Sequence, residues 1–251
     1  MNHFNYFFNN TSILFSYLIE LKYKIFYSFL MILITSISCY IYKDQLIYLM
    51  TSYLLHNMNS HRFIFTKLTE IFFVYLKFSL ILGFFISLPF IFFLFWLFFI
   101  PGLYEYEKKY LNIYLSVIII MFIISSILNY YFILPNILKF FLFFEQNSLY
   151  FPVHFEARLG DYLIPILFLM LNITLCFQIP SILLLLIFLN ILDFKLLYIK
   201  RKYFYLSFIL LSALISPPDF YNQLLLTSII IFVYESFIFL YFFFRYLFSN
   251  S

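Results

Sequence analysis

The sequence predicts an all-α, polytopic membrane protein with six transmembrane helices. Of its 251 residues, 65% are apolar and only 10% are charged, and the mean hydropathy is +1.01. Soluble domains are about half apolar and a quarter charged, which excludes a soluble globular protein. Disordered chains have low hydrophobicity and high charge, so this composition also excludes a disordered protein. The net charge of +4 is spread along the chain without a basic stripe, so no nucleic-acid partner is expected.

Six apolar runs are the candidate spans of a single domain over residues 1–251, since about 20 residues cross a bilayer. They cover residues 25–42, 71–100, 111–134, 162–192, 203–215 and 223–244. Pro89 is expected to kink the second run, and two prolines bend the fourth. The fifth run reaches only about 20 Å as a helix. Because Glu235 interrupts the sixth run, the last two helices are predicted to form a short pair.

The basic residues predict the orientation of the chain. Six spans leave both termini on one side of the membrane, and the connections on that side carry nine Lys or Arg against five on the other. The nine are Lys22, Lys24, Lys108, Lys109, Lys195, Lys200, Arg201, Lys202 and Arg245, and the five are Lys43, Arg62, Lys67, Lys139 and Arg158. Both termini are therefore predicted on the cytoplasmic or matrix side.

The residue types indicate an AT-rich genome. The chain has 41 Phe and 24 Tyr but only 3 Gly, and AT-rich codons specify the first two. No cleavable targeting segment is evident in residues 1–10, as expected for a protein made inside the compartment where it inserts. The mitochondrial inner membrane is the first expectation, with the plastid thylakoid and the bacterial inner membrane as alternatives.

Two carboxylates lie beside predicted spans on the cytoplasmic or matrix side of the membrane, which we call the inner side. Glu20 precedes Lys22 and Lys24, and either anchors the first helix through an i, i+4 pair or receives a cationic ligand. Glu107 and Lys108 follow a Pro-Gly turn. Glu107 either favours the start of the third helix or binds a guanidinium, which carboxylates hold in bidentate fashion.

Polar groups also occur in and beside the later spans. Two prolines in 216–219 end the fifth run, and Asp219 is placed to cap the sixth. Intramembrane polar residues are functional candidates by default, here Lys77, Gln178 and Glu235. Lys77 is expected to extend towards the membrane surface, and Gln178 to hydrogen-bond a neighbouring helix.

Enzymatic chemistry has no visible place in the sequence. All four histidines lie outside the predicted spans, which disfavours a haem held within the membrane. The two cysteines show no metal or disulfide spacing. Without a phosphate-binding loop or nucleophile motif, no catalytic residue, metal or cofactor is expected.

Four ordered segments resemble the TatC family, the polytopic subunit of the twin-arginine protein translocase. Residues 17–22 resemble its amino-terminal H-L-x-E-L-R segment, and 70–77 its E-x-F and lysine. Residues 96–108 are similar to W-x-F-x-x-P-G-L-Y-x-x-E-[RK]. Residues 216–223 are similar to [ST]-P-P-D-x-x-x-Q, and Glu235 follows as the acid of the sixth span. The resemblance extends over residues 16–244.

The resemblance implies a receptor for twin-arginine signal peptides on folded precursors, within a translocase driven by the proton-motive force. It also implies single-span TatA- or TatB-like partners, a homo-oligomer, surrounding lipid and a concave bundle. By analogy, the signal-peptide site would comprise Glu20, Glu107, Lys22 and Lys108, and the docking site for partner helices Ser216, Asp219, Gln223 and Glu235.

Three positions depart from the family pattern. Tyr17 replaces a histidine, and Lys22 replaces an arginine. Gln178 stands where many bacterial members have a glutamate, so any role there that needs a charge is in doubt.

Two other functions remain open from the residues alone. An ion-coupled secondary transporter could use Lys77, Gln178 and Glu235 as a path at the midplane, but no inverted repeat is visible. A structural subunit of a respiratory complex would also be apolar and organelle-encoded. Neither alternative explains the ordered motifs.

Overall fold

The computed structural model describes most of the chain. Its backbone is described for residues 2–57, 63–64, 68–102, 105–143, 146–147, 152–153, 158–188, 192–215 and 220–249. Side chains are described for a smaller set, beginning at Phe15.

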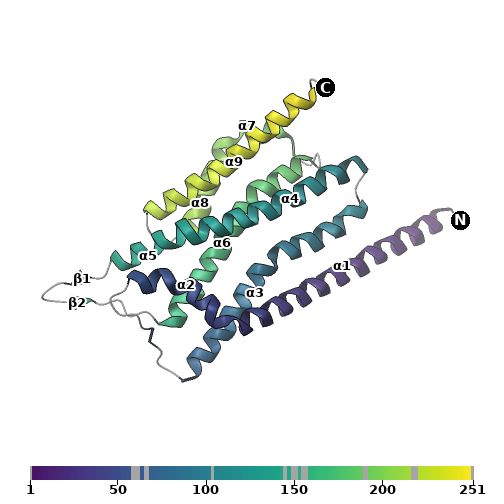
Figure 1. Cartoon of the computed structure of the whole chain (residues 1–251). Coiled ribbons are helices and arrows are strands. Elements are labelled where there is room, and N and C mark those ends of the chain that lie inside the picture. Colours follow the sequence, from purple (N-terminus) through teal and green to yellow (C-terminus); the bar gives the residue numbers. More distant parts are fainter. Residues whose placement is uncertain are drawn as a thin grey trace.

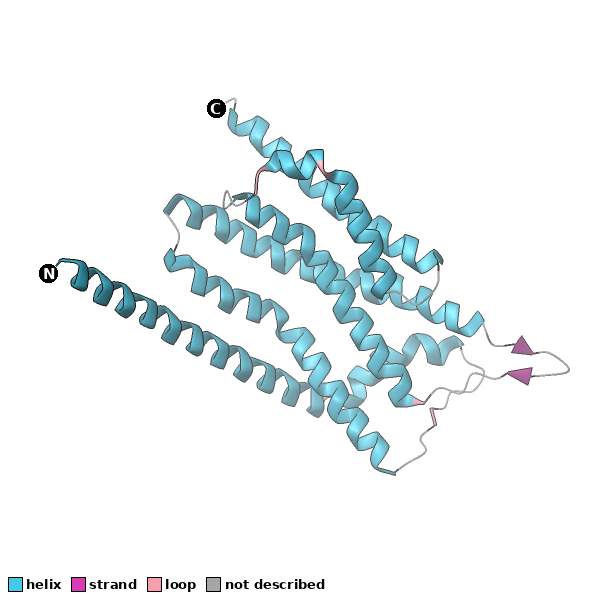
Figure 2. Cartoon of the chain, turned by 180° about the vertical axis from the view of Figure 1, so that it is seen from behind, coloured by secondary structure: helices cyan, strands magenta, loops and turns pink. Residues whose placement is uncertain are grey.

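The described residues form a bundle of helices (Figure 1). The helices are α1 (Asn2–Ile41), α2 (Lys43–Asn57), α3 (Leu68–Phe99), α4 (Glu105–Leu128), α5 (Leu134–Phe143), α6 (Leu159–Phe188), α7 (Phe194–Ile199), α8 (Arg201–Ile215) and α9 (Phe220–Ser249). A 3-10 turn, Ile100–Gly102, follows α3, and a π-helical turn, Asn129–Ile133, joins α4 to α5. Two short antiparallel strands, β1 (Gln146–Asn147) and β2 (Pro152–Val153), extend from one end of the bundle (Figure 2).

Five helical segments are long and apolar enough to span a membrane. They are Phe15–Ile41, Thr69–Gly102, Leu115–Lys139, Leu159–Leu183 and Phe220–Phe239. At 15 residues, α8 is about 22 Å long and packs beside α9. Both termini lie at the same end of the bundle (Figure 1). The predicted fold class, an all-α polytopic membrane protein, is confirmed.

The central helix of the bundle is α6. It packs against α3, α4, α8 and α9, and 61% of its most apolar 18-residue window is buried. Many large apolar side chains on the other helices are exposed, among them Ile37, Phe90 and Phe232. Since lipid is as apolar as these side chains, their exposure fits a surface in contact with a bilayer.

Helix α1 meets α3 at a glycine. A Cβ atom added to Gly83 would lie 2.6 Å from the Cα of Ser36, closer than any side chain allows. The Thr35 hydroxyl donates a hydrogen bond to the Gly83 carbonyl at 2.9 Å. Helices in a membrane associate through such small residues because their backbones can then approach closely. Gly83, one of only three glycines in the chain, sets the distance between α1 and α3.

Two tyrosines fix α2 at the end opposite the termini. Tyr130 donates to the Leu49 carbonyl at 3.0 Å, and Tyr162 donates to the Met50 carbonyl at 3.2 Å. The predicted polar connection between the first two spans therefore contains a helix tied to the π-helical turn and to α6.

Candidate functional site

The first candidate region is the inner half of α1. Glu20 is half-buried on this helix, and Lys22 is exposed. Helix α1 continues back through residues 11–24, so Glu20 lies within a continuous helix rather than in a separate segment before it. No ion pair joins Glu20 to another residue whose side chain is described, and its carboxylate is accessible to a ligand.

The second region is the start of α4. Glu107 lies in the first turn of this helix. Its side chain lies outside the described part, as do residues 103–104. Lys108 is half-buried. The end of α3 and the start of α4, which carries Glu107, lie at the same end of the bundle as the N-terminal part of α1 (Figure 1).

The third region is the hairpin of α8 and α9, where Glu235 has two partners on α8. The Tyr205 hydroxyl donates a hydrogen bond to Oε1 of Glu235. The Arg201 guanidinium lies 3.6 Å from Oε2, with about a third of each side chain of this pair exposed. Both partners come from the first two turns of α8, so Glu235 lies at the inner end of the hairpin.

Tyr234 holds the inner end of this hairpin together. Its side chain is buried, and its ring stacks on Phe204 with centroids 5.6 Å apart. The ring also contacts Phe208 edge-on at 5.4 Å. Its hydroxyl donates to the Leu197 carbonyl at 3.2 Å. Glu235 therefore directly follows a residue of a packed aromatic cluster that joins α8 to α9.

The outer end of the hairpin is described only in part. Ser216 and Asp219, two predicted docking residues, lie outside the described residues. Gln223, the third, is half-buried, and its backbone carbonyl accepts a hydrogen bond from the Thr227 hydroxyl at 3.0 Å. Helix α9 extends from Gln223 to Glu235 for twelve residues, or about 18 Å, so the two residues lie far apart along the hairpin.

Of the intramembrane polar candidates, Lys77 is exposed on α3. Gln178 is buried between α6 and α4, and its amide donates to the Ile118 carbonyl at 3.3 Å. No described residue donates a hydrogen bond to its Oε1 atom. Gln178 therefore joins two helices, and its carbonyl oxygen is free of the other described residues.

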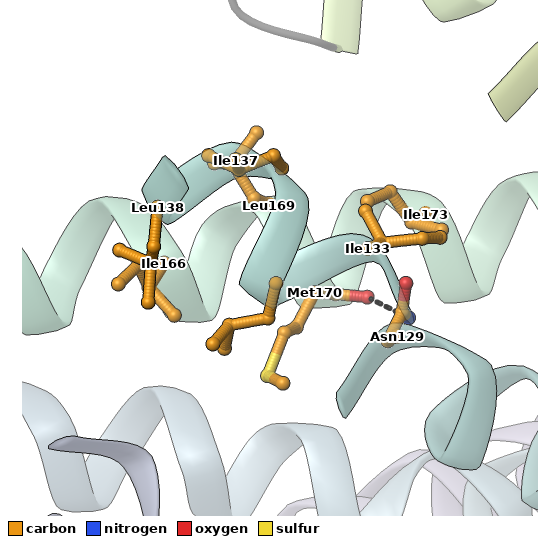
Figure 3. A pocket seen from close by; sticks show the side chains of 9 residues that line it. Asn129, Ile133, Ile137, Leu138, Ile166, Leu169, Met170 and Ile173 are labelled. Carbon is orange, nitrogen blue, oxygen red and sulfur yellow. Dashed lines mark hydrogen bonds between the residues drawn. The ribbon is translucent and has the colours of Figure 1, made fainter. Parts of the chain in front are cut away.

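A second amide, Asn129, joins the same two helices at the π-helical turn. Its Nδ2 donates to the Met170 carbonyl at 3.2 Å and to the Thr174 hydroxyl at 3.1 Å. Figure 3 shows Asn129 at one end of a small pocket that Ile133, Ile166 and other apolar side chains line. The pocket is almost entirely apolar, which does not suit a bound ion.

Sequence patterns did not predict a site role for Arg201, Tyr205 or Asn129, and Arg201 was counted only among the basic residues that orient the chain. Arg201 and Tyr205 are spaced i, i+4 in the first turns of α8, a spacing that places both on the face towards Glu235. Asn129 was visible as an amide within an apolar run. Among the described residues, no three His, Cys, Asp or Glu side chains gather to hold a metal ion.

A family model matches most of the chain. The family of the Sec-independent protein translocase protein, TatC, matches residues 16–228. This range includes the segments that carry Glu20, Glu107 and Gln223.

Two relatives and one solved structure are similar over nearly the same range. The uncharacterized tatC-like protein ymf16 of Reclinomonas americana is 32% identical over 222 residues, 88% of this chain and 84% of that protein. The Sec-independent protein translocase protein TatC of Rickettsia prowazekii is 31% identical over 222 residues, 88% of each. A crystal structure of the twin-arginine translocase receptor TatC in DDM superposes with a TM-score of 0.74 at 28% identity, covering 89% of this chain and 98% of that chain.

Proposed function

This chain belongs to the TatC family of Sec-independent protein translocase proteins, and on that premise we propose that it is a twin-arginine signal-peptide receptor. It is the core subunit of a translocase that moves folded proteins across a membrane with the proton-motive force. The observation that carries the proposal is the match over residues 16–228, because it includes both inner carboxylate segments. The similarity to a solved twin-arginine translocase receptor, at 28% identity, supports the same role.

Glu20 and Glu107 bind the two arginines of the signal peptide. A guanidinium and a carboxylate form paired, charge-assisted hydrogen bonds that an ammonium cannot reproduce. Each contact contributes about 1.5–3 kcal/mol, so loss of one glutamate weakens binding by about 10- to 100-fold. Lys22 and Lys108 flank the site and limit it to peptides that place their cations at the two acids.

Equilibrium binding of labelled peptides to the reconstituted full-length protein tests the proposal. We expect an Arg-Arg peptide to bind at least about tenfold more tightly than its Lys-Lys counterpart, since only arginine pairs in bidentate fashion. The Glu20→Gln/Glu107→Gln variant keeps the size of both side chains and should bind the two peptides equally and weakly.

A matched variant separates this site from the net charge. Asp44→Asn/Asp161→Asn removes the same two negative charges from exposed positions on α2 and α6, at the other end of the bundle. It should bind the Arg-Arg peptide as the unaltered protein does. Equal loss in both double variants, or equal affinity for both peptides, would overturn the arginine-recognition proposal.

The α8–α9 hairpin docks a single-span TatA- or TatB-like subunit. Because α8 is short, it spans less than the hydrocarbon core, which is about 30 Å thick. Four residues provide polar groups along the hairpin: Ser216, Asp219, Gln223 and Glu235. The contacts of Glu235 with Tyr205 and Arg201 support this docking role, because they hold α8 and α9 together.

Photocrosslinking from residue 223 tests the docking site. A probe at Gln223 should form an adduct with a single-span subunit, whereas a probe at the exposed Phe90 on α3 should not. Equal yields from both positions would indicate random contact within the membrane and contradict the docking site.

The protein acts in the mitochondrial inner membrane, as a homo-oligomer and without catalysis or a cofactor. The AT-rich composition supports this location, as do similar proteins of mitochondrial origin in Reclinomonas americana and Nephroselmis olivacea. Immunogold labelling of intact cells would distinguish mitochondria from plastids.

A further inference from the structure

A basic and aromatic patch lies where α7 meets α8, and we call it the α7–α8 patch. It consists of Lys195, Lys200 and Lys202 together with Tyr198 and Tyr203, all of them exposed. Asp193 is the one acid between residues 193 and 203. With Arg201, this stretch of eleven residues carries four cations against one anion.

The aromatic rings of the patch are fixed beside its cations. The guanidinium of Arg201 lies 4.4 Å from the centre of the Tyr198 ring, and the Tyr198 ring contacts Phe242 of α9 at 6.2 Å. The ammonium of Lys202 lies 5.2 Å from the Tyr203 ring. These contacts hold the patch in one arrangement against the end of α9.

The cations at the start of α8 do not stabilise that helix. Lys200, Arg201 and Lys202 surround the start of α8, which has no acid in its first turn. The positive end of the helix dipole disfavours cations there. Orientation of the chain in the membrane needs basic residues on this side, but it does not require three in a row at that end. An external anion would relieve the repulsion.

The apolar residues of α7 place the patch at the membrane surface. Leu197 is buried in the bundle, whereas Leu196 and Ile199 are exposed, Ile199 to 72%. A short helix with exposed aliphatic side chains beside lysines and tyrosines is typical of a segment at the lipid–water interface. The anion that the patch can meet at this depth is a phospholipid headgroup.

We propose that the α7–α8 patch binds the headgroup of an anionic phospholipid on the inner face of the membrane. The three lysines contact the phosphate oxygens, and the acyl chains lie against Leu196, Ile199 and the neighbouring face of α9. Arg201 remains with Glu235 and Tyr198, so lipid binding leaves that pair intact. A phospholipid fits better than a soluble phosphate because the exposed leucine and isoleucine require an apolar partner.

Native mass spectrometry of the full-length protein with added cardiolipin or phosphatidylcholine tests the proposal. Each juxtamembrane cation strengthens binding to an anionic lipid by about fivefold. The Lys195→Gln/Lys200→Gln/Lys202→Gln variant should therefore bind cardiolipin at least about tenfold more weakly. The corresponding triple Lys→Arg variant keeps the charge and should bind normally.

A matched control removes three cations from the opposite face. Lys43→Gln/Lys139→Gln/Arg158→Gln changes the net charge equally and should leave cardiolipin binding within about threefold of the unaltered protein. Equal losses in the two triple variants, or equal binding of phosphatidylcholine by the unaltered protein, would overturn the proposal.

Lysine acetylation in nanodiscs provides a measurement on the unaltered chain, independent of how the variants fold. An anionic headgroup at the patch should slow acetylation of Lys195, Lys200 and Lys202 by at least about threefold relative to zwitterionic nanodiscs, while exposed Lys139 changes little. Equal labelling in both lipids would overturn the site. This result is separate from the receptor proposal, since it uses no signal peptide.

Discussion

The candidate spans of α1 and α6, Phe15–Ile41 and Leu159–Leu183, have similar mean hydropathies of 1.7 and 2.0, but one lies at the edge of the bundle and the other at its centre. Of their most apolar 18-residue windows, 17% is buried in α1 and 61% in α6. Helix α1 packs mainly on α3, whereas α6 packs on α3, α4, α8 and α9. Hydropathy predicted both as spans and could not distinguish the edge from the centre, because lipid and protein interior are equally apolar.

Small and polar residues occur on the buried face of both helices. On α1 the buried side chains include Ser28, Ser36 and Cys39, and on α6 they include Gln178 and Ser181. The two helices use these residues differently. Close backbone approach joins α1 to α3 at Gly83, whereas side-chain amides join α4 to α6.

The largest loss of stability is expected at the edge of the bundle, between α1 and α3. There Gly83→Val places a branched side chain against the Ser36 backbone. Overpacking of this kind costs about 3 kcal/mol when neither backbone can move easily. The free energy of unfolding in an SDS titration measures the loss.

Gly102→Val is the matched control, because an added Cβ there meets no atom within 4 Å. It should change the free energy of unfolding by less than about 0.5 kcal/mol. Equal effects of the two substitutions would contradict close packing between α1 and α3.

A smaller effect is expected in the centre, where Asn129→Leu removes two hydrogen bonds to α6. Buried hydrogen bonds within a membrane contribute about 0.6–2 kcal/mol each. The same SDS titration should show a loss of about 1–2 kcal/mol. Asn172→Leu, at an exposed position of α6, should cost almost nothing, and an equal cost would show that the Asn129 contacts do not stabilise the bundle.

The smallest effect on stability is expected at Glu235. The side chains of Glu235 and Arg201 are about a third exposed, and ion pairs open to water contribute about 1 kcal/mol or less. A double-mutant cycle of Glu235→Gln and Arg201→Gln should give a coupling energy within this limit. A value well above it would mean that the pair is shielded from solvent and forms part of the packed core.

Much of this architecture could be predicted from the sequence, because apolar length is nearly sufficient to find a membrane helix. The short α8 followed from the 216–219 turn. Helix α2 was not predicted, since its hold on the bundle depends on Tyr130 and Tyr162, which are far away in the chain. Helical spacing at Glu20 and Lys24 was predicted, but not that α1 continues unbroken from Asn2 to Ile41.

The candidate residues could be located along the chain but not paired. Glu235 stood out as an acid in an apolar run, whereas its contact with Arg201 depends on how the α8–α9 hairpin closes. The buried position of Asn129 depends on the π-helical turn that ends α4. Contacts of this kind come from tertiary structure, which residue spacing within one segment does not contain.

Photocrosslinking from Glu20 and Glu107 to a signal peptide tests the receptor role most directly. Probes at residues 20 and 107 of the reconstituted protein should form adducts with an Arg-Arg peptide, and a probe at Asp44, on the other membrane face, should form none. Lys-Lys peptides should reduce both adducts by at least about tenfold. Adducts of equal yield with both peptides, or an equal yield from position 44, would contradict arginine recognition at the two glutamates.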